Sequence, residues 1–325
     1  MASAHQPAEQ AQPSGQHETR TNLRGVLAVF TGACVIGFSA IFAKWAMAGG
    51  ATPVSVGFYR MGLALPVAFA LARRSGGMGS RQGQTWALLA GGAFFVDLVL
   101  WHLSMKYTTA ANATLLVAGL APIWVALFSL AVLHLRYRWF GWVGQGIGVG
   151  GALILAIARG ARSGSGKGEA IAMVASLCYA TFALCMSRAR RHLNTEQSLF
   201  WMSLGSFVGF AIAALATGQP MRGYSSLAWA SLVGLALVVQ LVAWWMSTWG
   251  LGHVNAALGA IALQGQQVAT MFLAAWLLQE AIKPLGLLGA GLIIVGILLV
   301  AWARPSGRAA RPETHPVVVP GPTVD

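Results

Sequence analysis

The chain repeats itself at a spacing of 143 residues. Between positions 86 and 115, 13 of 30 residues are identical to the residue 143 positions further along. The matches include uncommon residue types, such as Trp101 with Trp244 and Asn112 with Asn255. Self-similarity of this kind predicts a fold built from two copies of one structural unit. Any fold assigned to the chain must therefore accommodate an internal duplication.

The composition excludes an ordinary soluble domain. Of the 325 residues, 57% are hydrophobic and only 9% are charged, and the mean hydropathy is +0.66. Soluble domains carry about 25% charged residues. The net charge of +13 is not arranged for nucleic-acid binding, because the basic residues lie between apolar runs and do not line a helix face. The lipid bilayer is the expected environment.

Ten apolar runs are long enough to cross a membrane. A bilayer core about 30 Å thick requires roughly 20 helical residues. The eighth and ninth runs share one uncharged stretch, which Gly250–His253 divides. We therefore predict an all-α integral membrane protein with ten transmembrane helices. The runs are 24–46, 53–72, 85–105, 108–133, 139–158, 169–187, 197–217, 226–249, 254–279 and 284–303.

The duplication divides the ten runs into two sets of five. Residues 22–160 form the first predicted repeat and residues 161–303 the second, while the tails 1–21 and 304–325 are polar and expected to be disordered. The fifth and tenth runs match at a spacing of 145. Because five is odd, the second repeat must enter the membrane in the opposite orientation. The prediction is two inverted five-helix repeats.

The basic residues are distributed unequally between the two sides of the predicted membrane. With the N-terminus inside, 13 of the 21 lysines and arginines fall in inside segments, 6 in outside loops and 2 within spans. Arg159, Arg162 and Lys167 oppose this bias. The positive-inside rule therefore predicts an inner-membrane protein with both termini in the cytoplasm.

Two helix-weakening residues occupy corresponding positions near the middle of the fourth and ninth spans. Pro122 removes a backbone donor, and its mate at the 143-residue spacing is Gly265. Three amide side chains, Gln264, Gln266 and Gln267, flank that glycine. Paired interruptions indicate a midplane substrate site with hinges at Pro122 and Gly265. The alternative is a pair of ordinary kinks satisfied by neighbouring helices.

Charged and titratable residues inside the spans form a second group of candidates. Asp97 is the only acidic residue in the interior of any span (Glu169 is the first residue of the sixth), and the repeat mate of Asp97 is Gln240. A carboxylate in a membrane is costly and is a functional candidate by default, either for a cationic group or for a proton. Arg60 and His102 are further substrate-binding candidates. The alternatives are a structural Asp97–Arg60 ion pair or a hydrogen bond between Asp97 and His102, outward snorkelling of Arg60, and a packed histidine.

Four tryptophans lie deep within the predicted spans. Trp101, Trp124, Trp244 and Trp276 lie deeper than the tryptophans close to the span ends, where interfacial tryptophans are common. They predict an apolar wall for a solute cavity, suited to apolar, aromatic or cationic groups. The alternative is packing against lipid.

The organisation of residues 24–303 resembles the EamA-type proteins of the drug/metabolite transporter superfamily. The similar patterns are Phe58–Tyr59–Arg60 in the second span, a small-residue stretch from Thr108 to Pro122, and Glu280 after the ninth span. Arg136 and the glutamine cluster at 264–267 depart from the family pattern. The resemblance implies export or exchange of amino acids and other small metabolites.

The sequence gives no indication of catalytic, metal or cofactor chemistry. The glycines between Gly144 and Gly151 recur in the tenth span, which favours helix packing over dinucleotide binding. We therefore expect a secondary transporter, a monomer or homodimer, that exports a small organic solute by alternating access. Solute uptake, a membrane enzyme acting on lipid-linked substrates, and a scaffold without transport are the alternatives. The solute and any coupling ion stay open.

Overall fold

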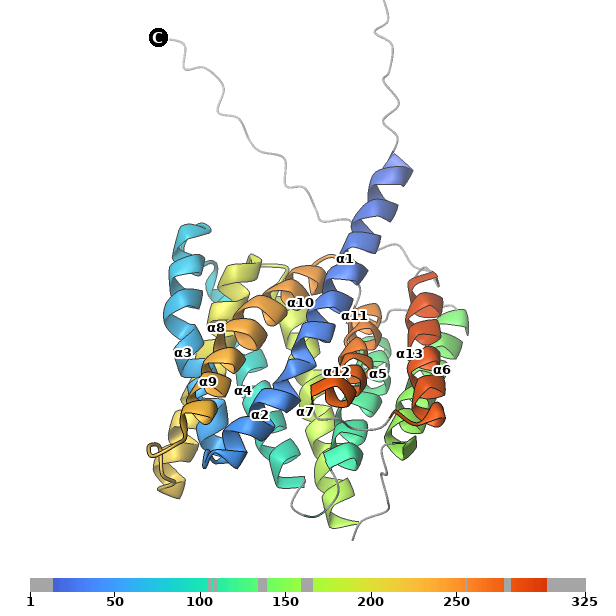
Figure 1. Cartoon of the computed structure of the whole chain (residues 1–325). Helices are drawn as coiled ribbons and strands as arrows, with labels where there is room; N and C mark the ends of the chain where they lie inside the picture. The colour runs from blue at the N-terminus through green and yellow to red at the C-terminus, as the bar shows by residue number, and fades with distance from the viewer. Residues whose placement is uncertain are drawn as a thin grey trace, which may run out of the picture.

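The computed structural model consists of helices joined by short connections (Figure 1). It describes residues 14–104, 107, 110–133, 139–158, 166–254, 256–277 and 282–302, and no strand occurs among them. The helices are α1 (Ser14–Ile36), α2 (Phe38–Ala48), α3 (Pro53–Arg74), α4 (Arg81–Ser104), α5 (Ala110–Leu133), α6 (Trp139–Ala158), α7 (Lys167–Ala189), α8 (Thr195–Thr217), α9 (Ser226–Gly234), the π-helix η1 (Leu235–Ala243), α10 (Trp244–Leu251), α11 (Ala256–Ala262), α12 (Gly265–Leu277) and α13 (Pro284–Trp302).

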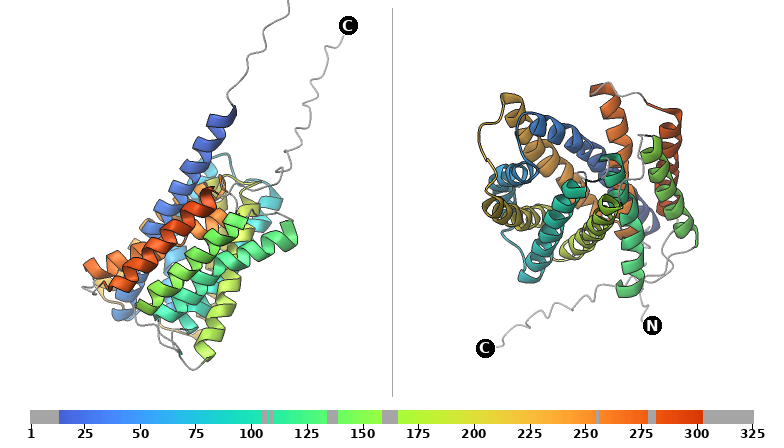
Figure 2. Two further views of the ribbon diagram at one scale, coloured as in Figure 1. Left: turned by 90° about the vertical axis from the view of Figure 1, so that its right-hand side faces the viewer. Right: turned by 90° about the horizontal axis from the view of Figure 1, so that it is seen from below.

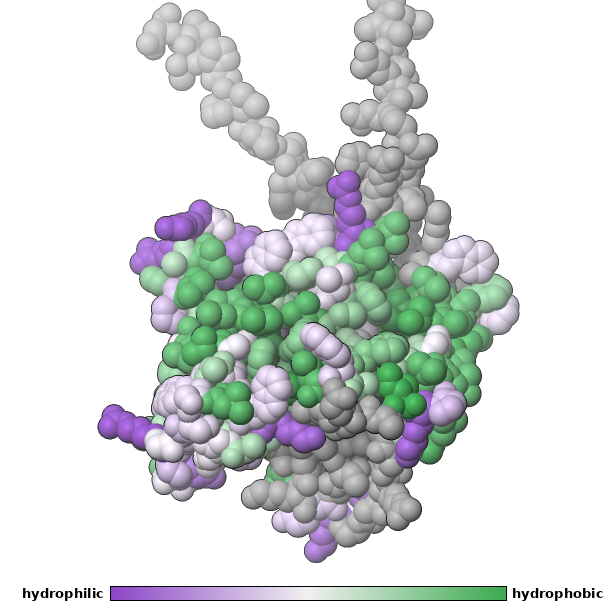
Figure 3. Space-filling model, in the orientation of Figure 1, coloured by the Kyte–Doolittle hydropathy of each residue, from purple (hydrophilic) through white to green (hydrophobic). Residues whose placement is uncertain are grey.

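These helices form the ten predicted membrane segments. Three segments are composite, namely α1 with α2, α9 with η1 and α10, and α11 with α12. In the described part of the chain, seven segments are long and apolar enough to cross a bilayer, and shorter apolar helices lie in α5 and α13. An apolar belt crosses the middle of the molecule, with hydrophilic residues above and below it (Figure 3). The chain is therefore a multi-pass membrane protein.

Equivalent positions in the two halves begin helices in the same way. Thr52 caps α3 through the backbone amide of Ser55, and the hydroxyl of Ser55 accepts from the amide of Thr52. Asn194 and Gln197 make the same reciprocal bonds at the start of α8. Such boxes satisfy amides that lack partners within the helix. Local chemistry thus marks the same boundary in each repeat.

The first helix begins earlier than the apolar pattern predicts. The helix α1 starts at Ser14, within the tail 1–21 that we expected to be disordered. Extending an existing helix fixes one residue for each hydrogen bond gained, which is easier than starting a new helix. Residues 1–13 and the tail from residue 303 lie outside the described residues.

The helices pack in pairs that follow the repeat. Helix α4 packs on α7 and α8, while its repeat equivalent, the α9–η1–α10 segment, packs on α1, α2 and α3. Helix α5 packs on α7, as α12 packs on α1. The pair α6 and α13 lies at one edge of the molecule, beside the remaining helices (Figure 2). The architecture is two inverted five-segment repeats.

Glycines bring α6 and α13 into close contact. A Cβ atom at Gly296 would lie 2.7 Å from the Cα of Gly148, and one at Gly151 would lie 2.7 Å from the carbonyl oxygen of Gly289. Both distances are too short for any larger side chain. Membrane helices associate through such small-residue faces, since lipid supplies no hydrophobic driving force between them. The packing role predicted for the glycines between Gly144 and Gly151 is confirmed for Gly144, Gly148 and Gly151, whereas Gly146 and Gly150 have no described neighbour within 4 Å of the position that a Cβ would take and do not share it.

Three of the segments are irregular, and they pack together. The first span is interrupted at Gly37, the eighth contains the π-helix η1, and the ninth is interrupted between Ala262 and Gly265. Their repeat equivalents α7, α4 and α5 are unbroken α-helices that pack on one another. We call the first three segments the irregular group and α4, α5 and α7 the regular group.

Two of the interruptions face each other and exchange hydrogen bonds. The hydroxyl of Thr270 donates to the carbonyl of Gln266 at 2.7 Å and lies 3.3 Å from the carbonyl oxygen of Gly37, and the thiol of Cys34 donates to the carbonyl of Gly265 at 4.0 Å. Neighbouring side chains thus supply partners for carbonyls at the breaks, as a membrane interior requires.

Candidate functional site

A cavity of about 60 Å³ lies between the two groups of helices. Arg60 and Asp97 are its two charged lining residues, and aromatic side chains form much of the remaining wall. Both repeats contribute to it. The lining residues are Ile36, Ser39, Arg60, Phe94, Asp97, Leu98, Trp101, Val117, Ala118, Tyr179, Trp244 and Gln266.

Arg60 is held in the protein interior by polar and aromatic neighbours. Its side chain is only 5% exposed. The Nε atom donates to Oε1 of Gln240 at 3.1 Å, and Nη1 donates to the hydroxyl of Ser39 at 3.2 Å. The guanidinium carbon lies 5.6 Å from the ring centre of Phe94. Because the charge is buried and held in place, outward snorkelling of Arg60 is excluded.

Asp97 faces the same cavity with an unsatisfied carboxylate oxygen. The residue is 3% exposed, and its Oδ1 has no hydrogen-bond partner among the described residues. Arg60 attracts it electrostatically, yet no ion pair within 4.0 Å joins the two. A buried polar group without a partner costs free energy. The carboxylate is therefore available to a ligand.

The apolar wall is a cluster of aromatic rings. Trp244 is 2% exposed, and its ring lies 5.2 Å from that of Phe94 and 5.1 Å from that of Phe182, in edge-on arrangements. The indole Nε1 of Trp244 has no partner among the described atoms. Trp101 lines the cavity beside Tyr179. Such a wall accepts apolar groups and offers one further donor.

The polar centre is built from residues that correspond between the repeats. Arg60 and Ser203 are mates at the 143-residue spacing, as are Asp97 and Gln240. Gln240, which is fully buried, joins one pair to the other: it accepts from Arg60 and donates to the hydroxyl of Ser203 at 3.0 Å. One repeat thus contributes both charges and the other contributes neutral partners.

The predicted residues of the ninth span divide between the cavity and the helix break. Gln266 lines the cavity. Gln264 and Gln267 are buried and hydrogen-bonded to each other, and neither is among the residues that line it. Gly265 begins α12 directly after the interruption, where a Cβ would lie 2.7 Å from the ring of Phe30. The sequence thus located a break in this span.

The remaining predicted residues lie in different surroundings. Pro122 is buried within α5, which continues through it without interruption. His102 belongs to α4, and its side chain lies outside the described residues. Trp276 is 70% exposed on the outside of the bundle, and Trp124 donates to the hydroxyl of Ser176 at 2.8 Å. These two tryptophans do not line the cavity, because their helix faces point elsewhere.

Three polar residues of the site were not predicted. Ser39 and Ser203 are ordinary serines in apolar runs, and Tyr179 is isolated in the sixth span. The repeat would have located Ser203 from Arg60, and Tyr179 is likewise the mate of Ile36, which also lines the cavity. No group of three or more metal-binding side chains occurs among the described residues.

A ten-segment bundle of two inverted repeats around a central polar cavity is the architecture of a secondary transporter. The model of the EamA-like transporter family matches residues 23–157 and again residues 166–302. The chain therefore belongs to the EamA-like transporter family, within the drug/metabolite transporter superfamily of small-solute transporters.

Comparison with solved structures agrees on the fold. One, described as "Crystal structure of protein", superposes with a TM-score of 0.71 at 20% sequence identity and covers 85% of this chain and 97% of its own. No curated protein matches the chain. These similarities do not identify the solute.

Proposed function

We propose that the protein exports a small zwitterionic solute, an amino acid or a related metabolite, across the inner membrane by alternating access. The observation that carries the proposal is the placement of one buried guanidinium and one buried, unsatisfied carboxylate on a single cavity. A zwitterion would place its carboxylate at Arg60 and its ammonium group at Asp97, pairing both charges at once. The aromatic wall would then face the solute side chain.

The cavity is too small to hold a solute in the observed arrangement, which supports a cycle in which it expands. Ligand pockets generally measure about 300–1,000 Å³, whereas this cavity is about 60 Å³. A solute would fit only after the surrounding helices move apart. We therefore assign the observed arrangement to a contracted stage of the cycle.

The interrupted helices supply a way to open it. Gly37 lies between the lining residues Ile36 and Ser39, η1 ends directly before Trp244, and the interruption of the ninth span lies beside Gln266. All three irregularities border the cavity. π-Helical turns and broken membrane helices commonly mark functional sites. Rocking of the irregular group against the regular group would expose the cavity to alternate sides, with Gly265 as the predicted hinge; Pro122 lies within the unbroken α5, so the paired interruption predicted there is not observed.

The proposed orientation of the protein in the membrane is based on the distribution of its basic residues. The segments on the side where α1 begins and α13 ends contain most of the basic residues, which supports cytoplasmic termini. Solute gradients or exchange would drive the transport.

Exchange in liposomes tests the proposal. Purified protein, inserted with known sidedness, is loaded with an unlabelled amino-acid mixture and offered labelled amino acids one at a time. We expect accelerated uptake of label for at least one zwitterion, and faster efflux from the cytoplasmic face than influx. Absence of exchange across a broad panel of amino acids and related zwitterions would refute the assignment, and faster influx would refute export alone.

A further inference from the structure

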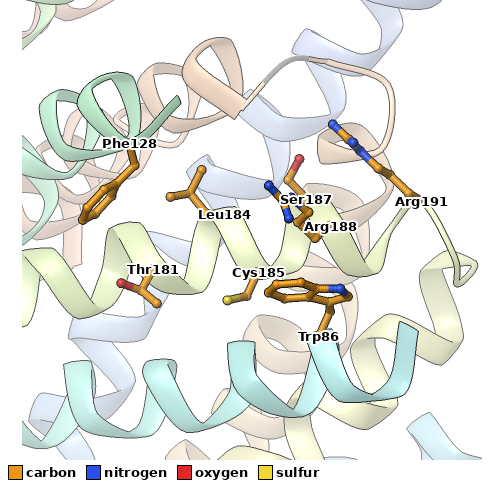
Figure 4. Close-up of a pocket in the computed structure, with 8 residues that line it drawn as sticks. All are labelled: Trp86, Phe128, Thr181, Leu184, Cys185, Ser187, Arg188 and Arg191. Carbon is orange, nitrogen blue, oxygen red and sulfur yellow. The ribbon is translucent and has the colours of Figure 1, made fainter. Parts of the chain in front are cut away.

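A second and larger cavity lies away from the central site, on the outer face of α7 (Figure 4). Its volume is about 250 Å³, and it opens to the surface as a groove. Residues of α4, α5 and α7 line it, and Thr181 at its edge is exposed. The lining residues are Trp86, Phe128, Thr181, Leu184, Cys185, Ser187, Arg188 and Arg191.

The groove does not lead to the central cavity along α7. Tyr179 is the residue of α7 that lines the central cavity. The positions Thr181, Cys185 and Arg188 recur at intervals of three to four residues and share a face turned about 120–180° away from Tyr179, at 100° per residue. The groove therefore faces the surroundings of the bundle, where lipid lies.

Polarity changes along the length of the groove. Phe128 and Thr181 lie at one end and Arg191 at the other, with Leu184 between them (Figure 4). Arg188 is in the last turn of α7, about 10 Å along the helix axis from Thr181 at 1.5 Å per residue. The apolar end thus lies at the depth of acyl chains and the basic end at the depth of headgroups.

The basic end is positioned to bind an anion. The Arg188 guanidinium lies 5.3 Å from the ring centre of Trp86, which restricts its motion. Arg191 is exposed beside it, and none of the described lining residues is acidic. The neighbouring Arg190 points away, donating to carbonyls of Thr248 and Leu193. Arg188 and Arg191 thus both line an apolar groove that has no acidic residue among its described lining residues.

We propose that this groove is a binding site for one anionic phospholipid of the leaflet on the side where α1 begins and α13 ends. The phosphate binds Arg188 and Arg191, and an acyl chain lies against Phe128 and Leu184. Basic pockets between membrane helices bind anionic headgroups in this way. Because α7 also carries Tyr179, a bound lipid would contact the regular group directly behind the solute cavity.

Lipid retention measured by native mass spectrometry tests the site. The full-length protein in detergent is given equal amounts of phosphatidylglycerol and phosphatidylcholine of the same chain length. We expect one phosphatidylglycerol to be retained in preference. The double variant Arg188→Gln/Arg191→Gln should lose about thirty-fold in that preference, since each cation near an anionic surface is worth about fivefold.

The chain offers a matched control at the end of α3. Arg73 also stacks on an aromatic ring, at 5.2 Å from the centre of Phe69, and Arg74 follows it on the same side of the membrane. Neither lines the groove. The variant Arg73→Gln/Arg74→Gln should keep its lipid preference within about twofold. Equal loss in both double variants would show a general surface-charge effect and overturn the proposal.

Two further variants keep the test independent of folding defects. Arg191→Gln alters one exposed side chain and should lower the preference about fivefold. Thr181→Trp fills the apolar end while leaving both arginines, and should reduce retention of both lipids. A preference unchanged by removing the arginines, or retention unchanged by filling the groove, overturns the site.

Discussion

Replacing Asp97 by asparagine should weaken the binding of solutes that carry an ammonium group and leave other solutes almost unaffected. The substitution preserves side-chain shape and removes the charge. The carboxylate is buried, and its Oδ1 has no partner among the described residues, so a bound ammonium group would supply the missing interaction. The variant therefore removes a contact that exists only in the complex.

The expected size of the effect follows from that contact. A hydrogen bond to a charged group contributes about 1.5–3 kcal/mol. At about 1.4 kcal/mol for each factor of ten, the dissociation constant should rise about 10- to 150-fold. A matched acid that lacks the amine makes no bond to Asp97, so its affinity should change by less than about threefold.

The assay is a thermal-shift titration of purified protein with such matched pairs. Each amino acid is compared with its deaminated acid and with its decarboxylated amine, because ligand binding raises the apparent melting temperature by mass action. Arg60→Met is the reciprocal variant, and it should weaken the binding of solutes that carry a carboxylate. Proteoliposome exchange with the same compounds shows whether affinity and transport change together.

The opposing explanation is a structural ion pair between Asp97 and Arg60. Breaking a buried pair leaves one charge uncompensated and costs about 3–5 kcal/mol of folding free energy. That case predicts a large drop in the melting temperature of the solute-free protein and equal losses for all solutes. Equal weakening of the amino acid and its deaminated acid would refute our interpretation of the site.

Three other substitutions test the packing and the irregular helices. Gln240→Leu should lower the free energy of unfolding by about 1–3 kcal/mol, because its two polar partners lose their bonds; Gln145→Leu, at a buried amide without described partners, should not. Gly296→Leu places a Cβ 2.7 Å from the facing backbone and should lower the free energy of unfolding by about 1–3 kcal/mol. Gly291→Ala meets nothing within 4 Å and should be neutral or stabilising. Both glycine variants are compared by denaturant unfolding in detergent. Gly37→Ala, at the break in the first span, should slow exchange in liposomes more than it weakens solute binding in the thermal-shift assay; equal losses would refute a role in motion.

Hydropathy and the repeat together predicted the architecture. Ten apolar runs of about 20 residues and a 143-residue spacing can be read directly from the chain, and an α-helix of that length crosses the bilayer with its backbone hydrogen bonds satisfied within the segment. The early start of α1 was missed because helix extension into a polar segment leaves no hydropathy signal.

The predicted residues of the central site belong to types that are rare within membrane spans, and the residues that were missed belong to common types. Arg60 and Asp97 are conspicuous as charges within spans, and both line the cavity. Ser39 and Tyr179 matter only because folding places them beside those charges. The break at Gly37 was equally hidden, since the chain has 40 glycines and packing alone selects the one that interrupts a helix.

The unequal regularity of the two helix groups has an energetic consequence. In a duplicated transporter with identical halves, the pseudo-twofold axis would convert the inward-open form into the outward-open form, and both would have the same free energy. Here η1 and both interruptions lie in one group, while their equivalents are continuous. Exchanging the conformations of the two groups therefore does not give an equivalent structure. Under the proposed alternating-access cycle, the inward-open and outward-open forms of the empty protein would therefore differ in free energy.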